Sequence, residues 1–314
     1  MKKKFIAMTM AALMAMTALT GCGSKEGSLD QLTFTYVTSP LNVPSIIEKE
    51  KGIFAKTFED MGITVNYVEL TSGADQTQAL ASGDVQVLYA VGATSVILSA
   101  ANDADIKVLN MYSRSPKAFC MYAQDDSLTT PESLRGKTIA GPAGTNLHEL
   151  LVSYLATGNM TLDDVNYVNM SIPEAKAALD GGSIDVAMVA GATAYTAKQQ
   201  GYHLVADGEG LIDAIIAVAV TDKFYNEHPE IIEKLEEAQT EIADFMEENR
   251  EEAMEITANT LDLDISSVEE MLEYYDFSTE LKDADRAGFQ RTANFMYENG
   301  MIEKELDVDT LFYE

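Results

Sequence analysis

A repeated stretch of sequence constrains the fold of this 314-residue chain more than any other feature. Residues 79–94 (ALASGDVQVLYAVGAT) align without a gap to residues 178–193 (ALDGGSIDVAMVAGAT) with seven identities, and the tetrapeptide VNYV at 65–68 recurs at 165–168. The alternative explanation is convergent patterning of unrelated α/β units. Two matches at offsets of 99 and 100 residues instead favour two lobes of similar topology.

Short apolar runs alternate with helical patterns from residue 32 onward, which predicts an α/β protein. Several runs are almost continuously apolar, as in parallel strands that helices cover on both faces. The predicted strands are 32–37, 65–70, 85–90, 106–112, 117–123, 137–142, 165–170, 186–190, 203–206 and 214–220. From residue 221 onward the pattern is helical and carries 28 acidic residues against seven basic ones, which is typical of solvated helix faces.

Charge and residue types exclude several classes of function. The chain has 51 acidic and 21 basic residues, so its net charge of −30 repels phosphates and anionic lipids, and no nucleic acid is expected as a partner. Three scattered histidines, two cysteines and no CxxC or HExxH motif argue against a metal site. Motifs of nucleophilic catalysis and phosphate loops are also missing, so we expect no catalytic residues and no cofactor.

The N-terminus has the pattern of a bacterial export signal. Three lysines at 2–4 precede an apolar run, residues 5–20, that is too short for a permanent membrane span. The run ends in LTGC, which resembles a lipobox, so residues 1–21 are predicted to be a lipoprotein signal peptide and Cys22 the lipidation site. A plain secretory signal beside a chance cysteine is the alternative. Residues 22–31 then form a flexible tether, and we expect the protein on the extracytoplasmic face of the cell membrane.

Small and hydroxyl-bearing residues follow the predicted strands in both halves of the chain. Open α/β sheets bind ligands beyond the carboxyl ends of their strands, where helix N-termini offer free N–H groups. The same residues would also serve as ordinary helix caps, but their number favours a site that holds an anion without a cation. His148 lies one turn into the following helix and is a further candidate contact, and Asp213 is a candidate partner for a ligand amine.

The chain resembles the aliphatic sulfonate/nitrate/taurine-type solute-binding proteins of ABC transporters. The matching stretches are IIEKEKGIF (46–54), ELTSGADQTQALASGDVQV (69–87), LRGKTIAGPAGTNLHELL (134–151) and KFYNEHPEII (223–232). The resemblance implies an α/β, type II periplasmic-binding-protein fold, with two similar lobes around a central cleft and strand order 2-1-3-n-4 in each. Lobe 1 would comprise residues 32–113 plus 214–314, and lobe 2 residues 114–213, with hinge strands at 113–116 and 208–210.

The resemblance also implies a function. The protein would be a non-enzymatic, lipid-anchored receptor that closes its lobes on a small anionic or zwitterionic solute and delivers it to an ABC permease with its ATPase. The alternatives are an extracytoplasmic enzyme on the same fold and a receptor for a thiamine- or pyrimidine-type vitamin precursor. The ligand contacts that the family pattern implies are Ser39, Leu41, Asn42, Ser72, Gly73, Val91, Gly92, Gly144, Thr145, Asn146, Gly191 and Ala192.

Overall fold

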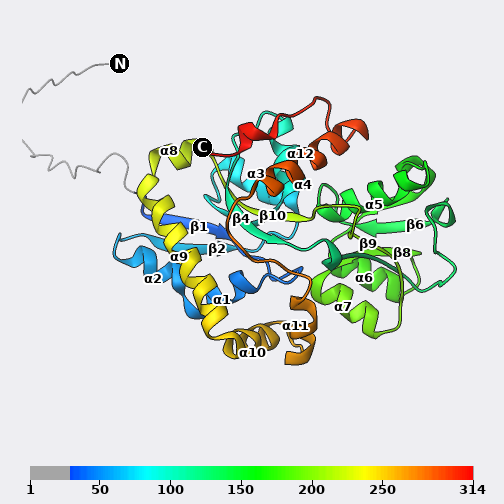
Figure 1. Ribbon diagram of the computed structural model, residues 1–314, viewed down its shortest axis with the longest axis horizontal. Helices are drawn as coiled ribbons and strands as arrows, with labels where there is room; N and C mark the ends of the chain where they lie inside the picture. The colour runs from blue at the N-terminus through cyan, green and yellow to red at the C-terminus, as the bar shows by residue number, and fades with distance from the viewer. Residues whose placement is uncertain (1–28, 314) are drawn as a thin grey trace, which may run out of the picture.

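Two α/β lobes lie side by side along the long axis of the molecule in the computed structural model, which describes residues 29–313 (Figure 1). The predicted signal peptide, Cys22 and most of the tether lie outside the described residues. In the first lobe, β1 (Gln31–Thr35) pairs in parallel with β2 (Thr64–Val68), and β10 (Ile215–Val220) pairs antiparallel with both β3 (Leu88–Gly92) and β4 (Lys107–Arg114). A parallel bridge between Phe34 and Val87 joins the two groups in the order β2-β1-β3-β10-β4.

The second lobe, drawn in green in Figure 1, contains one five-stranded sheet in the order β7-β6-β8-β5-β9. Strand β6 runs parallel to β7 and β8, whereas β5 runs antiparallel to β8 and β9. Strands β10 and β5 are each the first strand after the chain crosses from the other lobe, and this strand is the one written n. Both lobes therefore have the order 2-1-3-n-4. The predicted two-lobed fold is therefore confirmed, while the predicted residue boundaries of the lobes stay a prediction. The strands are β5 (Phe119–Ala123), β6 (Thr138–Gly141), β7 (Asn166–Asn169), β8 (Val186–Ala190) and β9 (His203–Asp207).

The sequence repeat maps onto equivalent elements of the two lobes. Its first copy runs from α3 (Gly73–Ser82) through β3 into α4 (Ala93–Ala101), and its second copy from α6 (Ile172–Asp180) through β8 into α7 (Gly191–Gln199). The VNYV tetrapeptides fall on β2 and at the start of β7. The matched glycines of the GAT triplets, Gly92 and Gly191, lie where the strand ends and the next helix begins.

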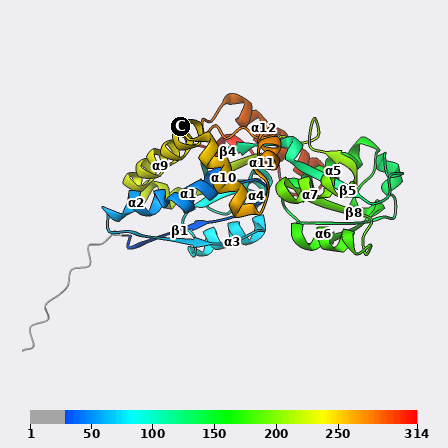
Figure 2. The same cartoon turned by 90° about the horizontal axis from the view of Figure 1, so that it is seen from below.

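The C-terminal third wraps back over the first lobe as helices. Pro229 begins the long helix α9, whose buried face carries Ile231, Leu235 and Ile242 at helical spacing, as the sequence pattern predicts. Helix α9 packs on α2 and α10 packs on α1 (Figure 2). The remaining helices are α1 (Val43–Lys51), α2 (Ile53–Glu59), α5 (Asn146–Thr157), α8 (Asp222–Glu227), α9 (Pro229–Glu248), α10 (Arg250–Leu261), α11 (Ile265–Leu272) and α12 (Asp283–Glu298).

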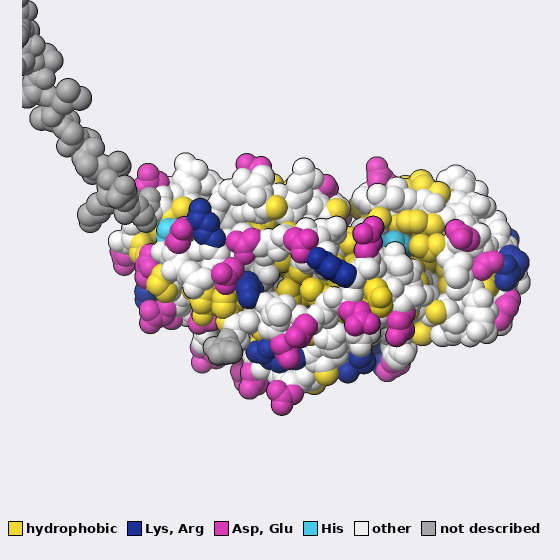
Figure 3. All heavy atoms as spheres, turned by 90° about the horizontal axis from the view of Figure 1, so that it is seen from above, with side chains coloured by type: hydrophobic (Ala, Val, Ile, Leu, Met, Phe, Trp, Pro, Cys, Tyr) yellow, Lys and Arg dark blue, Asp and Glu magenta, His cyan; other side chains and the backbone are white. Residues whose placement is uncertain are grey.

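Acidic side chains are spread over the face shown in Figure 3, with fewer basic ones between them. Most glutamates of α9 are exposed, as expected for the solvated face of an amphipathic helix. Cys120 is buried, and burial raises the pKa of its thiol to about 12, so it packs as a small apolar side chain. Among residues 29–313, no helix is long and apolar enough to cross a membrane.

Candidate ligand site between the lobes

A cavity of about 320 Å³ lies between the two lobes, at the ends of the strands that the sequence repeat marks. Its walls come mainly from the loops after β1, β2, β3, β6, β7 and β8, and from the first residues of the helices that follow. This is the position at which open α/β sheets bind their ligands, and the volume suits a small solute.

Seven of the predicted contact residues line this cavity, and the other seven do not. The lining includes Ser39, Asn42, Gly73, Gly92, Thr145, Asn146 and Ala192. The predicted residues outside the lining are Leu41, Ser72, Val91, Gly144, His148, Gly191 and Asp213. Their contacts in the structure explain their positions.

Three of the seven outlying residues, Leu41, Ser72 and Val91, have structural roles within the first lobe, and a fourth, Gly144, contacts that lobe from the second one. Leu41 is buried in the hydrophobic core that extends through both lobes, and Val91 in a second core of the first lobe. The Ser72 hydroxyl caps α3 by accepting a hydrogen bond from the Asp75 N–H at 3.1 Å. Gly144 has a φ of 65°, and its carbonyl oxygen accepts a hydrogen bond from the Ser95 hydroxyl at 2.8 Å.

His148 packs behind the cavity instead of facing it. Its Nδ1 accepts a hydrogen bond from the Gly144 N–H at 3.2 Å, and its ring stacks on Tyr167 with centroids 5.0 Å apart. Burial lowers the pKa of His148, so the ring is neutral around pH 7 and fixes the loop before α5.

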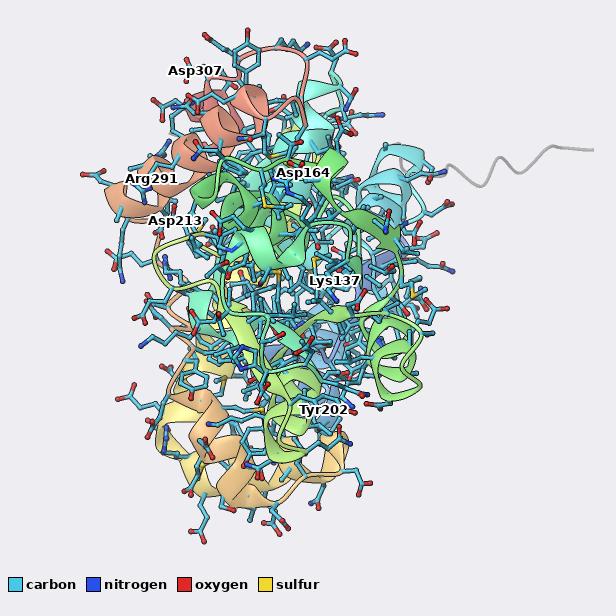
Figure 4. All side chains as sticks on the ribbon, turned by 90° about the vertical axis from the view of Figure 1, so that its right-hand side faces the viewer. Lys137, Asp164, Tyr202, Asp213, Arg291 and Asp307 are labelled. Carbon is cyan, nitrogen blue, oxygen red and sulfur yellow. The ribbon has the colours of Figure 1, made fainter. Side chains whose placement is uncertain are left out.

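Asp213 forms a two-pronged ion pair with Arg291 of α12, with oxygen–nitrogen distances of 2.7 and 3.0 Å (Figure 4). An amine held by Asp213 would have to compete with this guanidinium. Gly191 instead brings the two lobes together: with a φ of 53°, it lets the Ala192 N–H donate to the Pro40 carbonyl oxygen at 3.0 Å.

Hydrogen-bond donors without a partner gather in the cavity wall. The lining residues include no lysine, arginine or histidine. Among the described residues, the Ser39 hydroxyl and the Asn146 amide nitrogen are buried and have no hydrogen-bond partner. The N-termini of α3, α4, α5 and α7 also reach the lining, and the positive ends of these helix dipoles favour a negative charge. Thr145 contributes less, because its hydroxyl donates to the Pro142 carbonyl at 2.9 Å.

Unpartnered acceptors lie in the same wall. The Asn42 amide nitrogen donates to the carbonyls of Val37 and Ser39, which leaves Asn42 Oδ1 without a partner among the described residues. Gln76 donates in the same way to the Leu70 carbonyl, so its Oε1 is also left over, and Glu69 stands at the exposed rim. The residues that line the cavity thus carry both unpartnered donors and unpartnered acceptors.

Two features of the site escaped the sequence analysis. Part of the cavity wall is apolar and is formed by Phe119, Ile216 and Leu261. These residues come from elements far apart in the chain, so no local sequence pattern predicts that they meet. Glu149 lies one turn after Asn146 and is 4% exposed, and burial raises the pKa of its carboxyl to about 7. No group of three or more His, Cys, Asp or Glu side chains within residues 29–313 is arranged to hold a metal ion.

Comparison with known proteins identifies the family. A protein-family model described as NMT1/THI5 like matches residues 40–253, which include every loop of the cavity from Asn42 onward. The chain belongs to the NMT1/THI5-like family. The predicted relationship to sulfonate- and taurine-type binding proteins is confirmed by the relatives of this NMT1/THI5-like protein.

Three relatives illustrate the similarity. A putative aliphatic sulfonates-binding protein of Bacillus subtilis is 26% identical over 297 residues, covering 92% of this chain and 89% of the relative. The taurine-binding periplasmic protein of Escherichia coli is 29% identical over 205 residues, covering 64% of this chain and 62% of its own length. The alkanesulfonate-binding protein SsuA from Xanthomonas axonopodis pv. citri, solved bound to MOPS, has a TM-score of 0.81 at 20% identity, covering 90% of this chain and 98% of that one. The two sequence relatives are named as binding proteins and not as enzymes, in agreement with the sequence prediction.

Proposed function

We propose that this protein is the extracytoplasmic solute-binding component of an ABC importer and that it captures a small sulfonate, with a zwitterionic aminosulfonate such as taurine as the preferred ligand. The observation that carries the proposal is the cavity between the lobes, whose wall combines unpartnered donors with unpartnered acceptors and holds no cation. The names of the relatives support the sulfonate class. No bond is made or broken in this function.

The chemistry of the wall supports an anion held by short-range donors. The Ser39 hydroxyl and the Asn146 amide nitrogen are buried, and they and the helix N-termini act only at contact with a ligand. Asn42 Oδ1, Gln76 Oε1 and the Glu69 carboxylate would accept hydrogen bonds from an ammonium group at the other end of the ligand. A compact zwitterion satisfies both sets at once.

The remaining parts of the proposal concern the partners and the anchor. Residues 32–113 plus 214–314 and residues 114–213 would move as two lobes about hinges at 113–116 and 208–210, and the closed form would deliver the solute to a permease with its ATPase. Lipid on Cys22 would hold the mature protein at the outer face of the cell membrane. Contacts such as Ala192 N–H to Pro40 O would stabilise the closed form.

Isothermal calorimetry with taurine, ethanesulfonate, nitrate and a hydroxymethylpyrimidine tests the ligand class. We expect both sulfonates to bind, taurine more tightly, and the recovered ligand to be chemically unchanged. Ser39→Ala should weaken sulfonate binding, because a charged oxygen loses a donor, by about 1.5–3 kcal/mol. Ser72→Ala is the matched control, since that hydroxyl caps α3 outside the lining and its loss should leave affinity unchanged.

Two outcomes would contradict the proposal. Binding of the pyrimidine without binding of either sulfonate would assign the cavity to a vitamin precursor. Conversion of the ligand during incubation would make the protein an enzyme. Small-angle scattering with and without saturating taurine tests closure, for which we expect a smaller radius of gyration with ligand.

A further inference from the structure

One hydroxyl group lies between two acceptors behind the cavity wall. Thr94 Oγ1 of α4 is 2.9 Å from Asn146 Oδ1 and 2.6 Å from Glu149 Oε2, both of α5. On the far side of the carboxyl group, the Thr292 hydroxyl of α12 donates to Glu149 Oε1 at 2.9 Å. Thr94, Asn146 and Glu149 are 0%, 2% and 4% exposed, so water does not reach the cluster freely.

The protons of this cluster can be counted. A threonine hydroxyl carries a single proton, so Thr94 cannot donate to Asn146 Oδ1 and to an ionised Glu149 at the same time. With a proton on Glu149 Oε2, the carboxyl donates to Thr94, Thr94 donates to Asn146 Oδ1, and Thr292 donates to Glu149 Oε1. With the Asn146 oxygen facing Thr94, as in the structure, each of these three contacts has one proton only when Glu149 is protonated.

The proton decides which end of the Asn146 amide is free for the ligand. While Thr94 donates to Oδ1, the amide nitrogen is the end without a partner, and Asn146 lines the cavity. If Glu149 were ionised, Thr94 would donate to the carboxylate and would accept from the amide nitrogen of a rotated Asn146. The carbonyl oxygen would then be left for the ligand, and it would repel an anion.

We propose that Glu149 is a specificity-determining positioning residue, which in its protonated form holds the Asn146 amide as a donor toward the ligand, so that binding of an anion takes up a proton at Glu149. The inference rests on the proposed function in one respect, namely that the ligand presents an anionic group to this wall. It goes beyond that function by coupling solute capture to pH.

The charges around Glu149 are compatible with a proton near neutral pH. Burial raises the pKa of Glu149 to about 7, while the hydrogen bonds from the two threonines lower it and the charge of Asp213 raises it. Asp213 is paired with Arg291 of α12, and the neighbouring His148 is neutral because burial lowers its pKa. On β5, Cys120 and Tyr122 are ionisable, and Tyr154 and Glu132 lie at the opposite end of α5, while α4 and β8 carry no ionisable group. On α12, Asp285 pairs with Arg114, and Arg286 lies 3.6 Å from Asp309.

Proton uptake on binding tests the proposal directly. Calorimetry of ethanesulfonate, which exchanges no proton of its own, is carried out in buffers of different ionisation enthalpy. For the wild type at about pH 8 we expect uptake of about one proton per ligand and an affinity that falls by about tenfold per pH unit above the pKa. In Glu149→Gln, the amide donates to Thr94 and accepts from Thr292 as the protonated carboxyl does. That variant should bind without proton uptake, independently of pH, and more tightly than the wild type at about pH 8.

Glu48→Gln is the matched control. Glu48 is another buried carboxyl whose pKa burial raises to about 7, but it accepts hydrogen bonds from the Phe54 N–H and the Tyr67 hydroxyl within the first lobe and does not line the cavity. It should keep the proton uptake of the wild type. Ethanesulfonate binding without proton uptake, or a wild-type pH profile in Glu149→Gln, would overturn this inference alone. Absence of binding by both ethanesulfonate and taurine would reject the inference together with the proposed function.

Discussion

The substitution Gly191→Ala should weaken closure of the lobes, and hence ligand binding, beyond the loss of folding stability that it causes. Gly191 is the first residue of α7, with a φ of 53°, and a Cβ built on it would lie 1.6 Å from the carbonyl oxygen of Pro40 and 2.0 Å from its carbonyl carbon. Both are backbone atoms of the opposite lobe, so no side chain can turn away. The oxygen would be about 2 Å short of ordinary van der Waals contact, and α7 would have to retreat by that distance.

The magnitude has two parts. Alanine at a positive φ costs about 1 kcal/mol in any folded form, which lowers the melting temperature of the protein without ligand. Retreat of α7 also breaks the 3.0 Å hydrogen bond from Ala192 N–H to Pro40 O, which exists only where the lobes touch. Its loss costs about 1 kcal/mol of the closed form alone. Together with the lost contact, Gly191→Ala should weaken taurine binding by at least about tenfold.

Gly201→Ala is the matched control for this prediction. Gly201 also has a positive φ, 78°, but a Cβ there would meet nothing within 4 Å. Thermal unfolding should report a similar loss of stability for both variants, and calorimetry should report weaker taurine binding for Gly191→Ala only. Unchanged affinity in Gly191→Ala, or an equal loss in Gly201→Ala, would refute the argument that Gly191 serves closure.

Three further predictions concern stability and anchoring. Burial raises the pKa of Glu48 from 4.5 to about 7, so the folded protein binds more protons than the unfolded chain between these pH values. The free energy of unfolding of Glu48→Gln, measured with urea, should therefore rise by up to about 3 kcal/mol relative to the wild type as the pH increases through that window. A difference that stays constant with pH would contradict this prediction. Asp285→Asn should lose about 1.5–3 kcal/mol in the same assay, because Arg114 loses the carboxylate that contacts it at 2.6 Å and keeps only two backbone carbonyls and the more distant Asp276 at 3.6 Å. A loss below about 1 kcal/mol would mark the pair as dispensable. Cys22→Ser should release the protein from the membrane fraction, whereas full retention would rule out Cys22 as the lipid anchor.

The fold could be predicted from the sequence because its signals are local. Each of the ten predicted strands overlaps a strand of the structure, since runs of β-branched and apolar residues between turns are readable within a short window. The repeat gave the two lobes. Strand ends were less certain: the run predicted over 85–90 begins as β3 only at Leu88 and extends to Gly92, because Gln86 instead bonds the backbone N–H of Thr33.

The site could be predicted only in part. The loops were found, but whether a side chain faces the cavity depends on chain direction after the strand ends, which is why Leu41 and Val91 lie in the core while Asn42 and Gly92 line the cavity. Glu149 was missed for a different reason. Its partners Thr94 and Thr292 are 55 and 143 residues away in the chain, and no local pattern brings three such residues together.

The position of β10 has a consequence for the order in which the chain acquires its structure. This strand lies between β3 and β4, and its alternate residues belong to two different hydrophobic cores, with Ile216 and Val218 in one and Ala217 and Ala219 in the other. When residues 1–214 have been synthesised, the sheet of the first lobe still has a gap in its middle and neither core is complete. The second lobe, whose strands all lie within residues 119–207, has everything that its own sheet needs by then. The half of the molecule that begins the chain is therefore the half whose sheet is completed last.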